Sequence, residues 1–141
     1  MVHAAQVDSR YVLGAANWVD IDVPIHCSAL GRVLSAFGPL ELPSGALTRC
    51  SDGAVLPEAS LAEDAAAIRT RGFAITHGDF ELGLDAVAAP VRGQGGAVLA
   101  AIGISGPAVR MTARIEEFGR LLVHEADLLS RGLAKLPAHR Q

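Results

Sequence analysis

Two apolar segments separated by a glycine-rich stretch constrain the fold of this chain most. Residues 84–91 and 97–105 are rich in Val, Ile and Ala, and residues 93–96 between them read Gly-Gln-Gly-Gly. Apolar runs of this length joined by a short glycine-rich turn are typical of a β-hairpin. We therefore expect these two segments to be the central antiparallel strands of a sheet.

Three other segments predict helices. Apolar residues recur at helical spacing over residues 29–37, with Ser28 or Cys27 near the N-cap, until Gly38. Ser60 begins a capping box, and the Ala-rich helix expected after it ends at Gly72. Thr112 is expected to cap a long amphipathic helix. Its apolar face would carry Ile115, Phe118, Leu122, Leu129 and Leu133.

The remaining segments complete an α+β pattern. Residues 73–76 alternate as a strand, and a further strand pair is expected around Asp8. Residues 40–57 contain many Pro and Gly residues, which predicts a surface excursion with at most one short turn of helix. Because helices and strands alternate without a regular βαβ period, we expect an α+β fold.

Composition excludes several classes of protein. The chain has 141 residues, of which 50% are hydrophobic and 19% charged, so we expect one compact domain rather than a disordered chain. Its net charge of -3 lacks the basic excess that direct binding to nucleic acid uses. The apolar run 97–104 is shorter than the roughly 18 residues of a membrane span. We therefore expect no membrane partner.

Two cysteines, Cys27 and Cys50, bear on the compartment and on catalysis. They could form one disulfide at most, and a chain of this size does not need one, so we expect reduced thiols in the cytoplasm. The N-terminal residues show no secretory signal. His26 beside Cys27 would suit an activated nucleophile, but adjacent residues in an extended segment point to opposite faces. Burial of Cys27 as a small apolar residue is the preferred interpretation.

A metal site would have to combine His26, Cys27, Cys50 and His77. No two of these residues have the spacing of a known metal motif, so no metal and no cofactor are predicted.

Other residues favour ligand binding. The helix that begins near Ser28 offers backbone N–H groups to a carboxylate at Ala29 and Leu30. Residues two apart on a strand share a face, and small residues there would leave room for an apolar cavity with a few polar groups. The two such pairs, on neighbouring strands, are Leu84 with Ala86 and Gly103 with Ser105.

Four blocks in a fixed order carry a resemblance to a known family. They are Val-Pro-Ile-His-Cys-Ser-Ala-Leu-Gly-Arg at 23–32, Arg-Gly-Phe-Ala at 71–74, Glu-Leu-Gly-Leu-Asp-Ala-Val-Ala-Ala-Pro-Val at 81–91 and Ala-Ile-Gly-Ile-Ser-Gly-Pro at 101–107. Together they resemble the C-terminal effector-binding domain of the IclR family of bacterial transcriptional regulators. The blocks span most of the chain.

This resemblance implies a GAF-like fold, a curved antiparallel sheet flanked by helices, with an effector pocket between the sheet and the first of these helices. The family pattern has two serines in its last block, whereas this chain has Gly103 at the first of them, which removes a hydrogen-bond donor and leaves more space. The ligand-binding residues that the resemblance implies are Val23, Ala29, Leu30, Thr76, Leu84, Ala86, Gly103 and Ser105.

The resemblance also implies an organisation and a function. Residues 1–141 would be one effector-binding domain without its first helix and strand and without the winged helix-turn-helix that reads DNA. A small organic acid would act as effector, and copies would assemble as a homodimer or homotetramer. Two alternatives stay open: an enzyme with Cys27 as nucleophile, and an oligomerisation module whose pocket binds nothing.

Overall fold

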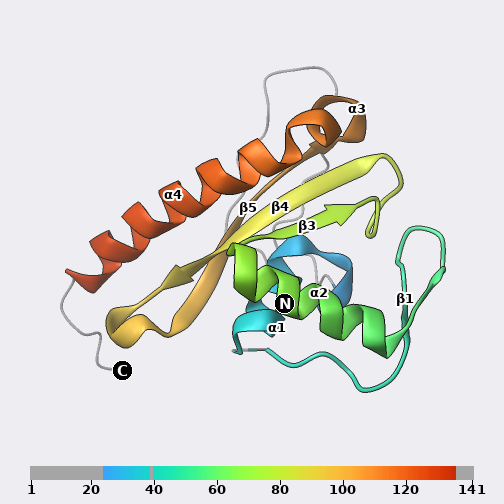
Figure 1. Cartoon of the computed structure of the whole chain (residues 1–141), viewed down its shortest axis with the longest axis horizontal. Coiled ribbons are helices and arrows are strands. Elements are labelled where there is room, and N and C mark those ends of the chain that lie inside the picture. The colour runs from blue at the N-terminus through green and yellow to red at the C-terminus, as the bar shows by residue number, and fades with distance from the viewer. Residues whose placement is uncertain (1–23, 39, 136–141) are drawn as a thin grey trace.

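A three-stranded antiparallel sheet with the order β3-β4-β5 forms the centre of the molecule (Figure 1). The strands are β3 (Ala74–His77), β4 (Leu84–Arg92) and β5 (Val98–Pro107). The computed structural model describes residues 24–38 and 40–135. The strand pair expected around Asp8, and Val23 of the expected binding site, lie outside the described residues.

The predicted hairpin is confirmed. β4 pairs with β5 along its whole length, and the turn between them contains the short 3₁₀ helix η2 (Gln94–Gly96). Gly95 and Gly96 both have positive φ, at 80° and 85°, a backbone region that favours glycine. Glycine at these two positions therefore allows the backbone conformation that closes the hairpin.

Helices lie on both sides of β4 (Figure 1), and alternate residues of the strand face one side or the other. Val87, Ala89 and Val91 are buried against the long helix α4 (Ile115–Ala134). Ala86 and Ala88 pack on the opposite side against the helix α1 (Ala29–Phe37). Because both faces of β4 are covered, its sequence is apolar almost throughout.

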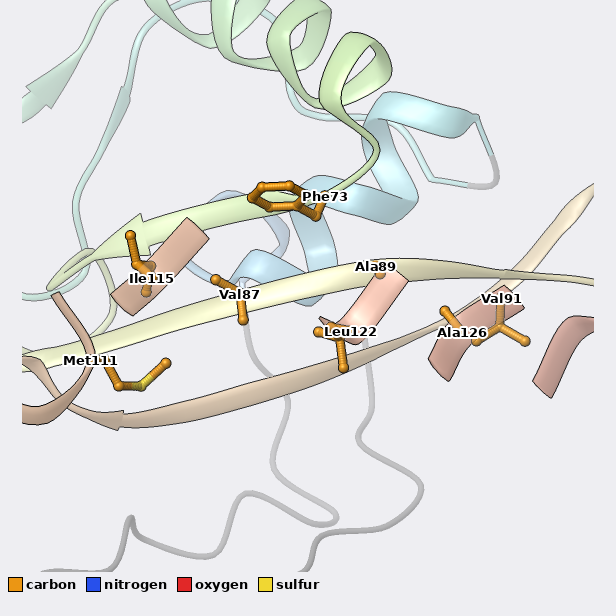
Figure 2. Close-up of a cluster of buried hydrophobic side chains, with 8 residues drawn as sticks. All are labelled: Phe73, Val87, Ala89, Val91, Met111, Ile115, Leu122 and Ala126. Carbon is orange, nitrogen blue, oxygen red and sulfur yellow. The ribbon is translucent and has the colours of Figure 1, made fainter. Parts of the chain in front are cut away.

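The larger core lies between α4 and the sheet (Figure 2). Phe73, the residue directly before β3, contributes its ring to this core. Gly119 of α4 lies against that ring, where a Cβ would collide with it. Along α4 the buried positions are Ile115, Gly119, Leu122 and Ala126. Leu129, expected on this face, is 45% exposed, because Ala126 and the partly buried Leu133 already cover the end of the sheet.

Helix α1 matches its predicted bounds. The Oγ of Ser28 accepts a hydrogen bond from the Gly31 N–H, and Gly38 ends the helix in the left-handed conformation at φ 110°. The turn before it, the 3₁₀ helix η1 (Ile25–Cys27), follows Pro24. Small residues let α1 pack closely on the sheet, where Ala29 and Val33 are buried.

Two predicted helix starts are wrong. Helix α2 (Glu58–Arg71) begins directly after Pro57, so Ser60 lies inside its first turn and caps nothing; Gly72 ends it as expected. Pro57 sets the entry because its φ is fixed and it needs no N–H donor. Thr112 does not cap α4 either: it belongs to the 3₁₀ helix η3 (Thr112–Arg114), which follows α3 (Ala108–Met111).

The excursion between α1 and α2 contains a small hairpin rather than a turn of helix. Its strands are β1 (Leu47–Thr48) and β2 (Val55–Leu56), which pair antiparallel. The hairpin is tied to the start of α1, because the Nε2 of His26 donates to the Thr48 carbonyl at 2.7 Å and Cys50 is disulfide-bonded to Cys27.

The helices also bear on the membrane prediction. Among residues 24–38 and 40–135, no helix has the length and apolarity that crossing a membrane requires.

Candidate functional site

A row of three residues crosses the sheet on the face that α1 covers. Thr76 of β3 lies opposite Ala86 of β4, which in turn lies opposite Ser105 of β5. Directly opposed residues in antiparallel strands project to the same face. Thr76 is buried, Ala86 is half-buried and Ser105 is exposed. The structure therefore places two hydroxyl-bearing residues on either side of a small apolar one.

In the next row towards the hairpin turn, Leu30 of α1 approaches β5 closely. Gly103 lies opposite Ala88, and a Cβ at Gly103 would come within 3.1 Å of the Leu30 side chain. Leu30 therefore lies beside this part of β5, where Gly103 stays exposed.

The N-terminus of α1 contributes backbone polarity to this region. The first N–H groups of an α-helix have no acceptor within the helix, and the helix dipole makes this end partially positive. The Oγ of Ser28 accepts from the Gly31 N–H, and Ala29 and Leu30 precede Gly31 in the first turn of the helix. This is the arrangement that attracts a carboxylate or a similar anion.

The arginine of α1 is engaged elsewhere. Arg32 donates from Nε to the His26 carbonyl at 2.8 Å, and its guanidinium forms ion pairs with Asp79 at 2.8 Å and Asp64 at 3.6 Å. Burial raises the pKa of Asp64, and the nearby Arg32 lowers it less than burial raises it. Arg32 therefore joins the start of α1 to α2 and to the turn after β3 and is not available to a ligand.

A shallow hollow lies apart from the row. It is enclosed by side chains of α1 and α2 together with Leu42, and none of its lining residues belongs to the expected binding site. Its lining residues are Arg32, Ser35, Leu42, Leu61, Asp64, Ala65 and Ile68.

The positions of the expected binding residues follow from these contacts. Ala29 and Leu30 of α1 lie over the same face of the sheet as Ala86. Leu84, two residues from Ala86, shares that face at the end of β4, opposite Pro107.

Cys27 and Cys50 depart from the expectation of reduced thiols. They form a disulfide with 6.0 Å between the two Cα atoms. The sequence did not predict this pairing because the residues approach each other only once the β1–β2 hairpin folds back on η1. Cys27 is fully buried, as expected, and its sulfur is bonded, so this structure offers no thiol nucleophile.

The disulfide is also part of a larger group. One ring nitrogen of His26 and the two sulfurs lie within 4.8 Å of one another. The premise of opposite faces was wrong, because residues 25–27 form a 3₁₀ turn and not an extended segment. His77, the fourth residue considered, is not part of this group.

Sequence reasoning missed one polar cluster on the other face of the sheet. The buried carboxylate of Asp85 accepts a hydrogen bond from Thr112 Oγ1 at 2.9 Å and lies 3.0 Å from Nδ1 of His77. His77 and Asp85 are directly opposite each other in β3 and β4, so only the strand register shows that they meet. The cluster fixes the segment after β5 to the sheet.

Comparison with known families matches nearly the whole chain. The family model described as the C-terminal domain of the bacterial transcriptional regulator IclR matches residues 1–131. The HTH-type transcriptional regulator BhcR of Paracoccus denitrificans is 34% identical over 116 residues, which are 78% of this chain. The glycerol operon regulatory protein of Streptomyces griseus is 32% identical over 109 residues, or 74% of this chain.

The chain spans about two fifths of the length of these two relatives, 42% and 41% respectively. Solved structures agree with the fold. The IclR protein of Thermotoga maritima superposes with a TM-score of 0.77 at 25% identity, covering 91% of this chain and 54% of that one. A transcriptional regulator from Rhodococcus gives 0.78 at 24% identity, covering 91% and 55%. The sequence blocks, the sheet flanked by helices and these matches establish that the chain belongs to the IclR family of bacterial transcriptional regulators, as its C-terminal domain.

Proposed function

We propose that residues 1–141 form a cytoplasmic sensor domain that binds a small organic acid or a related metabolite. The observation that carries this proposal is the row of Thr76, Ala86 and Ser105 beside the N-terminus of α1. A helix N-terminus favours a negative charge, and hydroxyl groups beside an apolar surface orient a ligand by hydrogen bonds. The domain is not proposed to be an enzyme, because the relatives it resembles are regulators and Cys27 is fully buried.

The shape of the site favours one end of the ligand over the other. Leu30 lies close to Gly103, so the ligand carboxylate would lie at Ala29 and Leu30 and its remaining atoms towards Ser105 and Leu84. Because Arg32 of α1 is paired with Asp64 and Asp79, we expect binding to depend on hydrogen bonds and apolar contact. A change of conformer population on binding would then alter the affinity for DNA.

A relative with a known ligand supports the chemistry only at the level of the fold. The PobR inducer-binding domain of Acinetobacter was solved, as a double mutant, in complex with 3-hydroxybenzoic acid. It superposes with a TM-score of 0.64 at 24% identity, covering 77% of this chain and 66% of that one. This fold therefore accommodates an organic acid in at least one protein.

The proposal assigns DNA binding to another part of the full-length regulator. With a net charge of -3, this domain is not expected to bind DNA by itself, and a winged helix-turn-helix would do so. Copies of the domain would pair as a homodimer or homotetramer.

A thermal-shift screen tests the site. The probes are glyoxylate, pyruvate and 3-hydroxybenzoate, and a ligand at 100 times its Kd stabilises a protein by about 2.7 kcal/mol. Ala86→Trp should fill the site and abolish the shift, whereas Ala62→Trp on the exposed side of α2 should keep it. Ser105→Ala removes only a hydroxyl and should weaken the shift, with Ser60→Ala as its control.

Two results would contradict the proposal. Equal shifts in Ala86→Trp and Ala62→Trp would place the ligand elsewhere. No shift with any small acid, tested at millimolar concentration, would favour the alternative of an oligomerisation module.

A further inference from the structure

His26, Cys27 and Cys50 form a site with the composition of a metal centre. The two sulfurs and one ring nitrogen of His26 lie within 4.8 Å of one another. Two thiolates and an imidazole are the ligands that zinc and similar borderline-soft divalent ions prefer. We propose that this group binds one Zn²⁺-class ion when the Cys27–Cys50 disulfide is reduced, so that the disulfide and the metal exclude each other.

One ring nitrogen of His26 is held by a backbone carbonyl, as in many metal-binding histidines. Its Nε2 lies 2.7 Å from the Thr48 carbonyl, which can only accept, so Nε2 carries the proton. Nδ1 then holds the lone pair and is the atom we assign as ligand. A backbone carbonyl that fixes the second nitrogen in this way holds the ring and raises its basicity.

The surrounding elements keep the ligands together without the disulfide. The His26–Thr48 hydrogen bond holds the hairpin to η1, and Arg49 donates to the His77 and Gly78 carbonyls at 3.0 and 2.9 Å. The residues that make these contacts, Thr48 and Arg49, directly precede Cys50, which lies in the turn between β1 and β2. Reduction therefore leaves two thiols close to the imidazole instead of releasing a free loop.

The disulfide is exchanged for the metal in two steps. A dithiol or phosphine reductant supplies two electrons, the S–S bond breaks and each sulfur takes up one proton. The ion then forms two metal–sulfur bonds and one metal–nitrogen bond, and the two thiol protons pass to solvent. A tetrahedral ion would keep its fourth position for water or another ligand.

The compartment decides which form exists. Glutathione and thioredoxin keep most cytosolic cysteines reduced, and in that setting a cysteine pair more often binds metal than forms a structural disulfide. The metal would then replace the disulfide as the link between the β1–β2 hairpin and the turn before α1. Because Ser28, the cap of α1, follows Cys27 directly, a change of tether would act at the same helix end as the proposed ligand site.

Cobalt titration of the 141-residue chain tests the proposal. Protein reduced with a phosphine and desalted without oxygen should bind one Co²⁺ per chain, with a thiolate-to-cobalt band in the near ultraviolet that Zn²⁺ displaces. The oxidised protein should show no such band. Bound Zn²⁺ should also protect both thiols from iodoacetamide.

Variants assign the ligands. Cys50→Ser should abolish the band, and His26→Gln, which can still donate to Thr48, should weaken binding at least about tenfold. His124→Gln, at an exposed position on α4, should bind as the wild type does. Far-ultraviolet circular dichroism of each variant checks that it is folded. A reduced wild type that shows no band, an oxidised protein that binds equally well, or a His26→Gln variant of unchanged affinity would overturn the proposal.

Discussion

Gly31 lies where α1 passes over the turn before it. A Cβ on Gly31 would collide with the carbonyl oxygen of Ile25, which is backbone and cannot rotate away. The glycine is therefore required by the close approach of η1 to α1, and the same approach brings His26 and Cys27 to the start of the helix. The sequence alone could not show this requirement, because Gly31 has an ordinary helical conformation.

Gly31→Ala should lower the free energy of unfolding by about 2 kcal/mol, the usual range for overpacking. Gly132→Ala is the matched control, since nothing lies within 4 Å of a Cβ there, and it should raise the stability by up to about 1 kcal/mol. Urea denaturation of both variants measures these changes. A Gly31→Ala variant more stable than the wild type would show that a Cβ at this position does not collide with the Ile25 carbonyl.

Burial in the fold disfavours the negative charge of Asp64. Its pKa is raised because burial disfavours the ionised carboxylate, and Arg32 and Arg71 offset this only in part. The folded protein thus holds the Asp64 proton more tightly than the unfolded chain does. The contribution of Asp64 to stability therefore falls as the pH rises above its usual pKa.

Asp64→Asn should consequently gain stability relative to the wild type as the pH is raised from about 3.5 to about 6.5. Urea midpoints of both proteins at several pH values measure the difference. Asp127→Asn, at an exposed position on α4, is the control for loss of one negative charge. A difference that is constant with pH, or that moves against Asp64→Asn, would show that the carboxylate is not disfavoured by burial.

At the scale of elements, local signals predicted what local physics decides. The glycine-rich turn predicted the β4–β5 hairpin, and Ser28 with Gly38 predicted both ends of α1. Signals of the same kind failed at Ser60 and Thr112. At Thr112 a tertiary contact took the side chain, since its hydroxyl bonds to Asp85.

The geometry of the candidate site was likewise predictable only where it depends on a local pattern. Alternation along a strand correctly placed Ala86 and Ser105 on their faces, and the register then showed that they are opposite each other. The β1–β2 hairpin, the disulfide and the Asp85 cluster depend on pairing between distant residues. No spacing in the sequence encodes such pairing.

The disulfide should stabilise the excursion that it closes. It spans 23 residues, and closing a loop of that length restricts the unfolded chain by roughly 3 kcal/mol. In the presence of a chelator, reduction of the wild type and the substitution Cys50→Ser should lower the free energy of unfolding by about that amount. The two effects should not add, because both remove the same bond. Equal urea midpoints with and without reductant would exclude a closed disulfide in solution.

At the scale of the whole molecule, helix α4 covers the sheet on one side and exposes leucines on the other. Leu121, Leu128 and Leu129 are 52%, 48% and 45% exposed, and the first two are seven residues apart on one face of the helix. Leucines grouped in this way on a helix surface are typical of contacts between copies of a chain.

The double variant Leu121→Lys and Leu128→Lys should therefore shift a wild-type oligomer to monomer in light scattering, because each lysine would place a charge in the apolar contact. Val109→Lys is the control, since Val109 is 93% exposed on the short helix α3. A wild-type protein that is a 14.6 kDa monomer at tens of micromolar would reject assembly through α4.

The ligand is proposed to bind beside the N-terminus of α1, over the row of Thr76, Ala86 and Ser105. Chemical-shift mapping by NMR locates it, with ¹⁵N-labelled protein titrated with the acid that gives the largest thermal shift. Binding there should cause saturable changes at the amides of Ala29, Leu30, Thr76 and Ser105. Changes confined to the hollow between α1 and α2, at Ser35, Leu61 and Ala65, would contradict it.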